Sequence, residues 1–370
     1  MFHRAWLEIN TRAFTSNLRH LREAADPASL LAVLKADAYG LGAVPLARAA
    51  MEAGAKRIGV ATANEALALA PLGFPIQVMS ALFPEELPPL IDAGIEIPLH
   101  DYPMAGAISE AAHLVGRRAR IHVKLDTGMG RLGLFPEDLE AVADIRHKFH
   151  NIDIVGIFTH FPRSTEHEAE YCRGQIAAMK KALAFFESKG INFQTIHIAN
   201  SDAICHLPET AKPPFNMVRA GLAMHGLVDN GESRPKWLKE VASFRARLVS
   251  VRTLPAGHAI GYSATHVLKQ PTRIGTIAAG YADGIPLALS NSCDVLVRGH
   301  RCPIVGRISM DYTTIDLTNA PRANTGDIVT LFGSERNETI SPADWARIKK
   351  THPYDIICSV SPRVPRIVGI

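Results

Sequence analysis

The sequence predicts a TIM-type (β/α)8 barrel followed by a second, β-rich domain, and three observations lead to this fold class. Apolar runs of strand length recur eight times between residues 31 and 220, with helical patterns between them. One run, LLAVLK, shows no polar alternation and ends in a lone lysine, Lys35. Near Trp237 the pattern changes to short strands punctuated by Pro and Gly.

The eight barrel strands are expected in regular βα succession. Helical patterns separate them, the clearest at 44–53, 65–72, 85–93 and 166–189, and Thr11 is the expected N-cap of a first helix. An open doubly wound sheet is the alternative, but no expected strand is followed by GxGxxG. The strands are expected at 31–34, 58–61, 76–79, 96–99, 120–125, 154–159, 195–199 and 217–220.

The second domain is expected to be mainly β-structure, with one helix at 342–350. We therefore place the barrel at residues 11–237 and the β-rich domain at 238–370. The strands expected in the second domain are 246–251, 273–278, 295–297, 314–317 and 328–332.

Composition excludes several classes of protein. A chain of 370 residues with 47% hydrophobic and 21% charged residues is globular rather than disordered. The net charge is +4 without a run rich in Lys and Arg, so we expect no nucleic-acid partner. No apolar run suits a signal peptide or a membrane span, and the five cysteines form no CxxC pair, which favours a cytoplasmic protein. The histidines lack HxxxH or HExxH spacing, so no metal site is expected.

Lys35 is the first candidate for chemistry. The C-terminal ends of barrel strands carry the active sites of TIM barrels. A partly desolvated ammonium there has a lowered pKa, which favours the neutral amine that forms Schiff bases. The alternative is a lysine whose aliphatic stem packs at a strand end while its ammonium reaches water.

Eight short words occur in order along the chain and carry a family resemblance. They resemble the alanine racemases, enzymes dependent on pyridoxal 5′-phosphate (PLP), from about Trp6 to Arg366. The resemblance implies a homodimer with shared active sites, an amino-acid substrate, and interconversion of L- and D-alanine, which supplies D-alanine for peptidoglycan. It also implies that residues 1–10 pair with the β-rich domain. The words are AVLKADAYGLG, KLDTGMGRLG, THF, HIANSDA, MVRAG, GYSATH, VGRISMD and SPRVPR.

By this resemblance, Lys35 binds the cofactor covalently, and Lys35 and Tyr262 are the two acid/base groups. Arg219 would face the pyridine nitrogen. Its guanidinium does not hand over a proton, so the ring stays a weak electron sink. The remaining cofactor contacts are implied for Tyr39, His160, Ser201 and Gly221; Ser201 and Gly221 follow strands seven and eight, where TIM barrels often bind phosphate.

The resemblance also assigns the substrate side of the site. Arg131 would hold the cofactor's phenolic oxygen and the substrate carboxylate. Lys124 matches a lysine that is often carbamylated in this family and would then orient Arg131; the alternative is an unmodified lysine that faces the surface. Backbone at Met310 and Asp311 would meet the same carboxylate, and Tyr281 and Tyr354 would narrow the entrance. Two departures are Ser309, where many relatives have cysteine, and His225, where an aromatic residue is usual.

Other functions stay open at this point. Within the same class, the substrate could be serine or several amino acids. A barrel-type PLP amino-acid decarboxylase shares the lysine, but GYSATH and RISMD fit it poorly. A single-barrel PLP carrier lacks a β-rich domain like the one expected after Trp237.

Overall fold

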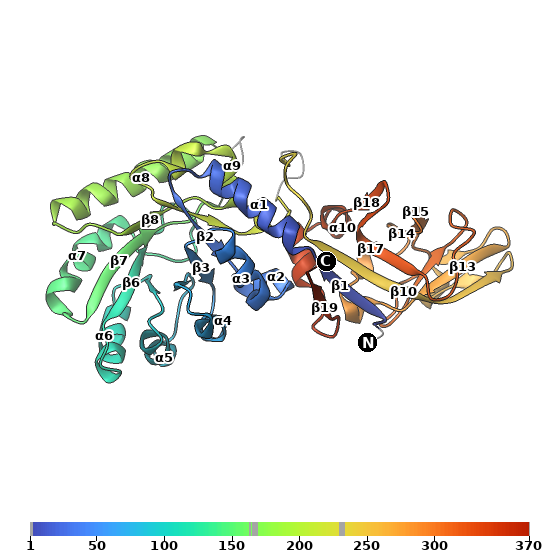
Figure 1. Cartoon of the computed structure of the whole chain (residues 1–370), viewed down its shortest axis with the longest axis horizontal. Helices are drawn as coiled ribbons and strands as arrows, with labels where there is room; N and C mark the ends of the chain where they lie inside the picture. Colours follow the sequence, from blue (N-terminus) through green and yellow to red (C-terminus); the bar gives the residue numbers. More distant parts are fainter. Residues whose placement is uncertain (1–2, 163, 165–168, 229–233, 370) are drawn as a thin grey trace. The chain divides into compact units, whose positions relative to one another are not determined.

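The computed structural model describes residues 3–162, 164, 169–228 and 234–369. The chain forms two compact units (Figure 1). The barrel unit comprises Thr15–Ala38 and Ala43–Met224. The β-rich unit comprises Met1–Phe14, Tyr39–Gly42 and His225–Ile370.

The barrel unit contains a sheet of eight parallel strands in the order β4-β3-β2-β9-β8-β7-β6-β5. A parallel bridge between Gln77 and Glu96 joins the first strand to the last and brings the sheet round into a barrel. All eight strands lie where the sequence predicts them, and the predicted fold class is confirmed. The bounds are β2 (Ser29–Val33), β3 (Arg57–Val60), β4 (Ile76–Val78), β5 (Ile97–Leu99), β6 (Ala119–Lys124), β7 (Ile152–Phe158), β8 (Thr195–His197) and β9 (Met217–Ala220).

Helices cover the outside of these strands (Figure 1). The predicted helix at 65–72 begins at a capping box between Thr62 and Glu65. Of the predicted helix at 166–189, residues 166–168 lie outside the described residues. The bounds are α3 (Ala43–Glu52), α4 (Ala63–Leu69), α5 (Leu87–Asp92), α6 (Met104–Leu114), α7 (Leu139–Lys148), α8 (Ala169–Ser188) and α9 (Ser201–His206).

Helix α1 (Thr11–Ala24) corrects one expectation from the sequence. The side chain of Asn10, rather than that of Thr11, accepts the backbone N–H of Ala13 at 2.8 Å. Asn and Thr both favour the N-cap position, and the sequence places the two side by side. The cap is therefore one residue earlier than predicted.

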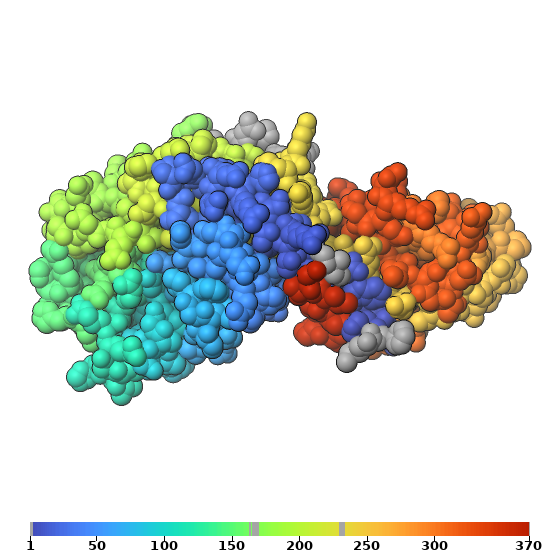
Figure 2. Space-filling model, viewed as in Figure 1, coloured from blue at the N-terminus to red at the C-terminus, as the bar shows by residue number. Residues whose placement is uncertain are grey.

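The β-rich unit is built on a nine-stranded sheet around the long strand β10 (Ala242–Leu254). Strand β1 (Ala5–Ile9) pairs antiparallel with β10 and parallel with β19 (Arg366–Val368), so the two ends of the chain meet in this sheet. Figure 2 shows β1 in dark blue beside red residues of the C-terminal segment. The other bounds are β11 (Ala259–Ile260), β12 (His266–Val267), β13 (Thr272–Ile277), β14 (Asp294–Val297), β15 (His300–Pro303), β16 (Thr313–Asp316), β17 (Ile328–Glu335) and β18 (Glu338–Ile340).

The β-rich unit also contains helices α10 and α11. Helix α10 (Pro342–Lys349) matches the predicted helix, and Ser341 caps it through a capping box with Asp344. The short helix α11 (Pro353–Cys358) was not predicted. Among the described residues, no helix has the length and apolar character needed to cross a membrane.

Candidate active site

Lys35 lies two residues after the end of β2 and is exposed, whereas Leu34 before it is buried. The next four residues, Ala36 to Tyr39, all have φ between 53° and 59°. For non-glycine residues this left-handed conformation costs roughly 1–2 kcal/mol each, so other contacts must hold it. The Glu65 carboxylate accepts the N–H of Ala36 at 2.7 Å, and that of Asp37 accepts the N–H of Ala43 at 2.6 Å. The turn after Lys35 is therefore both strained and anchored.

Arg219 lies in β9, is only 4% exposed, and has all its hydrogen bonds inside the barrel. Nη1 donates to Nδ1 of His197 at 2.9 Å, and Nη2 donates to the carbonyl of Thr159 at 2.8 Å and to Nδ1 of His160 at 3.1 Å. Burial lowers the pKa of Arg219 to about 9, so the guanidinium stays protonated at neutral pH. Because guanidinium has no acceptor, both imidazoles present a bare nitrogen to it.

Lys124 ends β6 and is buried with its ammonium 5.1 Å from the ring centroid of Phe158. Burial, and then the charges of Arg219 and Arg131, lower the pKa of Lys124 to about 8. About a tenth of this lysine is therefore a neutral amine at pH 7, far more than in an ordinary surface lysine.

Arg131 is exposed at the end of a loop that Asp126 organises. The Asp126 carboxylate accepts the backbone N–H groups of residues 128 to 131 at 2.8 to 3.1 Å. Burial acts to raise the pKa of Asp126, but these four donors lower it overall. The loop that carries Arg131 is thus held by one carboxylate.

Four cationic side chains of the barrel unit lie near enough to His160 to lower its pKa, and Arg219 is bonded to it. Burial is the largest cause of its lowered pKa, and the nearby cations lower it further, so this imidazole is neutral. A neutral histidine within a group of positive charges describes a site suited to an anionic ligand. The cations are Arg219, Lys124, Arg131 and Lys35.

Ser201 begins helix α9, which Asn200 caps. Its buried Oγ accepts the N–H of Gly221 at 2.8 Å and that of Ala223 at 3.3 Å. The loops after β8 and β9 therefore bring a hydroxyl and backbone N–H groups together. This is the type of donor group that binds phosphate.

The other predicted residues lie in the β-rich unit. Tyr262 occupies a short turn in which Ser263 has φ 62°, and it is 70% exposed. Tyr281 donates its N–H to the carbonyl of Ser309 at 3.0 Å, which ties it to the loop of Met310. That loop is anchored by Asp311, whose carboxylate accepts from Arg363 at 2.9 Å.

Tyr39 and Tyr354 also belong to the β-rich unit. The ring of Tyr354 stacks on His352 at 5.1 Å between centroids, and that of Tyr39 lies 4.9 Å from His225. Burial, followed by Cys358 and Tyr354, raises the pKa of Tyr39, so its hydroxyl keeps its proton. His225 is itself buried, and burial lowers its pKa to about 3, so its ring is neutral.

Sequence reasoning missed several residues that shape the site. His197 stands inside the word HIANSDA, in which only Ser201 was singled out, and its strand-end position was a usable signal. Asp126 was missed in the same way, because only Lys124 and Arg131 were selected from KLDTGMGRLG. In SPRVPR, Arg366 donates to backbone carbonyls of Gly40 and of residues 360, 361 and 364.

Comparison with known proteins identifies the family. The family model for the alanine racemase N-terminal domain matches residues 9–229, and that for the C-terminal domain matches residues 241–368. The chain belongs to the alanine racemase family. The resemblance expected from the sequence is confirmed.

Individual alanine racemases are similar over nearly the whole chain. The protein from Symbiobacterium thermophilum is 35% identical, covering 98% of this chain and 97% of its own. The one from Methanococcus maripaludis is 36% identical, covering 99% and 98%. The alanine racemase structure from Streptomyces lavendulae has a TM-score of 0.92 at 34% identity, covering 100% and 98%. The one from Bartonella henselae, with covalently bound pyridoxal phosphate, has a TM-score of 0.87 at 30% identity, covering 100% of both chains.

Proposed function

We propose that this protein is a PLP-dependent alanine racemase that interconverts L- and D-alanine and supplies D-alanine for peptidoglycan. Membership of the alanine racemase family supports the reaction class. The observation that carries the cofactor assignment is the group of four cations around neutral His160, with Lys35 exposed among them. A cytoplasmic location is part of the same proposal.

The residues of the barrel unit suit PLP chemically. Lys35 would bind the cofactor covalently. Its phosphate suits the hydroxyl of Ser201 and the N–H of Gly221. Tyr39, which belongs to the β-rich unit, is proposed as a further phosphate ligand on the family resemblance alone. Arg219 would face the pyridine nitrogen and His160 would lie beside the ring. When bound, PLP withdraws electrons from the substrate α-carbon and so makes its proton acidic.

Arg219 would determine the protonation state of the pyridine nitrogen that it faces. Its pKa of about 9 and its hydrogen bonds inside the barrel hold it as a cation near neutral pH. A guanidinium that keeps its proton leaves the facing ring nitrogen unprotonated. We expect this to favour return of the α-proton over transamination.

Lys35 and Tyr262 would be the two groups that move the α-proton. Racemisation requires a proton to leave one face of the α-carbon and a proton to return on the other. A single base would return the proton to the face it came from, so two groups are needed. The exposure of both side chains, on a strand end and on a turn, supports this assignment.

The substrate carboxylate would be held by Arg131 and by the backbone at Met310 and Asp311. We propose that Lys124 is carbamylated, because its amine is buried beside two arginines and its pKa of about 8 makes it nucleophilic. The modification would turn a cation into an anion that orients Arg131. Tyr281 and Tyr354 would restrict the entrance to small side chains.

We also propose that the enzyme is a homodimer with shared active sites. Tyr262, Tyr281 and Met310 are 70%, 42% and 52% exposed in the single chain, an unusual state for catalytic and substrate-binding residues. In the dimer, Tyr262 and the Met310–Asp311 loop would complete the partner's site. Two-fold symmetry would then create two identical sites.

The spectrum of the purified protein, followed by a racemisation screen across the amino acids, tests the function. We expect visible absorbance from lysine-bound PLP and racemisation of alanine above serine. Lys35→Ala should lose that absorbance and nearly all activity. Release of CO₂ without inversion would indicate a decarboxylase instead, and bound PLP without turnover would indicate a carrier. Borohydride trapping of PLP on another lysine would contradict the assignment of Lys35.

A further inference from the structure

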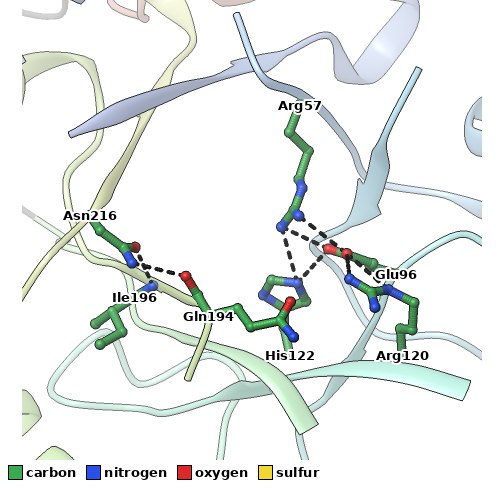
Figure 3. Close-up of polar contacts among 7 residues, drawn as sticks. All are labelled: Arg57, Glu96, Arg120, His122, Gln194, Ile196 and Asn216. Atoms are coloured by element: carbon green, nitrogen blue, oxygen red, sulfur yellow. Dashed lines mark hydrogen bonds and ion pairs between the residues drawn. The ribbon is translucent and has the colours of Figure 1, made fainter. Parts of the chain in front are cut away.

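The interior of the barrel next to Arg219 is polar, although barrel interiors are usually filled by branched apolar side chains. Gln77, His122 and His197 are each 0% exposed, and Glu96 is 5% exposed. They come from β4, the start of β5, β6 and β8. Figure 3 shows His122 meeting the Glu96 carboxylate, which also contacts Arg57 and Arg120.

Glu96 determines which nitrogen of His122 carries a proton. Its carboxylate lies 2.7 Å from Arg57 Nη1, 2.9 Å from Arg120 Nη2 and 2.6 Å from His122 Nε2. Burial raises the pKa of Glu96, but these partners lower it overall, to about 2, so it is an anion. Arg57 Nη1 also lies 3.3 Å from His122 Nε2, but a protonated Nε2 cannot accept from it, and the shorter 2.6 Å contact with the Glu96 anion makes Nε2 the donor. Because burial lowers the pKa of His122, its Nδ1 is left as a bare acceptor.

Arg219 sets the opposite state in His197. Since Arg219 donates to Nδ1, the single proton of neutral His197 lies on Nε2. The rings of His122 and His197 stand edge to face with centroids 5.8 Å apart. His197 thus presents a donor, Nε2–H, and His122 presents an acceptor, Nδ1. Neither of these two atoms has a hydrogen-bond partner among the described protein groups.

Gln77 is the register partner of Glu96, so the two side chains lie on the same face of the sheet, toward the barrel interior. Both polar atoms of its amide also lack a partner among the described protein groups. Buried polar atoms are nearly always hydrogen-bonded in native proteins, to protein or to ordered water. A buried water makes about three hydrogen bonds, so it matches this set of donors and acceptors.

We propose that a buried water site lies between His122, His197 and Gln77, and that through it Gln77, His122 and Glu96 are positioning residues for Arg219. The water accepts from Nε2 of His197 and donates to Nδ1 of His122, while the Gln77 amide holds it. This keeps His197 in the tautomer that accepts from Arg219. The role of Arg219 toward PLP rests on the proposed function, whereas the water site does not.

Arg120, which is bonded to Glu96, connects these buried polar residues to the solvent-exposed surface. The Arg120 side chain is 42% exposed and lines a pocket of about 730 Å³ together with Arg118, Arg146 and Gln194.

Nitrogen-15 NMR of the histidines tests the proposal on the folded enzyme, with and without PLP. We expect His197 to be the Nε2–H tautomer and its proton to show a cross-peak to long-lived water. Gln77→Met keeps the length of the side chain but removes both polar groups. It should lower the unfolding temperature by several degrees, abolish the water cross-peak and increase the Nδ1–H tautomer of His197. The signals of His225, in the β-rich unit, should not change and serve as the control.

The opposite results are equally definite. In a dry interior the unpaired amide of Gln77 only destabilises the fold, so Gln77→Met would leave the unfolding temperature unchanged or raise it. That result with unaltered His197 signals overturns the proposal. If Gln77→Met does not fold, absence of the water cross-peak in the unmodified protein overturns it. A protein that shows all expected signals but does not racemise alanine keeps the water site and refutes only the proposed function.

Discussion

The imidazole of His122 lies over the position that a side chain at Gly156 would occupy. A Cβ built on Gly156, in β7, would overlap Nδ1 and Cε1 of His122 in β6. The ring can therefore extend across β7 toward His197 in β8. A glycine in the middle of a barrel strand is explained here by the side chain that covers it.

Gly156→Ala should consequently destabilise the protein. Overpacking a well-filled interior costs about 1–3 kcal/mol, and this ring cannot move without losing its bond to Glu96. Urea unfolding measures the difference. The matched control is Gly174→Ala on exposed helix α8, where an added Cβ meets nothing and should stabilise by roughly 0.5–1 kcal/mol. Equal stability of Gly156→Ala and the unmodified protein would contradict the packing described.

Lys124 should become carbamylated in bicarbonate. The neutral amine is the form that reacts with CO₂, and the pKa of about 8 makes it more abundant than in an ordinary lysine. With ¹³C-bicarbonate we expect one carbamate signal in NMR that weakens as the pH falls below 8 and is absent from Lys124→Arg. If the two proteins give the same signals, Lys124 is unmodified.

The unmodified form of Lys124 has its own signature in stability. Its folded pKa of about 8 lies below the ordinary 10.5, so between these values the unfolded chain binds more protons. Stability should therefore rise with pH across that window, and Lys124→Met should reduce the rise.

Arg219→Glu should change the chemistry as well as the rate. A carboxyl group facing the ring nitrogen can share a proton with it, which strengthens the electron sink. We expect slower racemisation, a new long-wavelength absorbance during turnover and more transamination product, followed by spectroscopy and by keto-acid analysis. Arg219→Lys keeps a cation and serves as the control. An Arg219→Glu enzyme with unchanged rate and absorbance would give Arg219 a structural role only.

Mixing two inactive variants tests the shared site. If each site takes Lys35 from one chain and Tyr262 from the other, a mixed dimer of Lys35→Ala and Tyr262→Phe has one doubly damaged site and one intact site. Activity should recover toward half per mixed dimer. With subunit exchange confirmed by mass spectrometry, lack of recovery would mean that each site takes both residues from one chain.

The positions of the elements were readable from the sequence because they depend on local periodicity. The strand at 217–220 has the predicted bounds, and the other barrel strands differ by one or two residues at their ends. Shorter or unusual elements were not readable. Helix α11 has only six residues, and the left-handed turn after Lys35 contains residues that ordinarily avoid it. The roles assigned to the site residues by resemblance stay predictions.

The sequence by itself determined the fold class, the family and the set of candidate residues, because periodicity and short motifs are properties of neighbouring positions. Only the tertiary structure decided the state of those residues. Arg219 meets the imidazoles of His197 and His160, which lie 22 and 59 positions away in the chain, and these contacts define the tautomers of both rings. The pKa of Lys124 likewise depends on burial and on two distant arginines. Charge, protonation and hydration of a site arise from groups that only folding brings together.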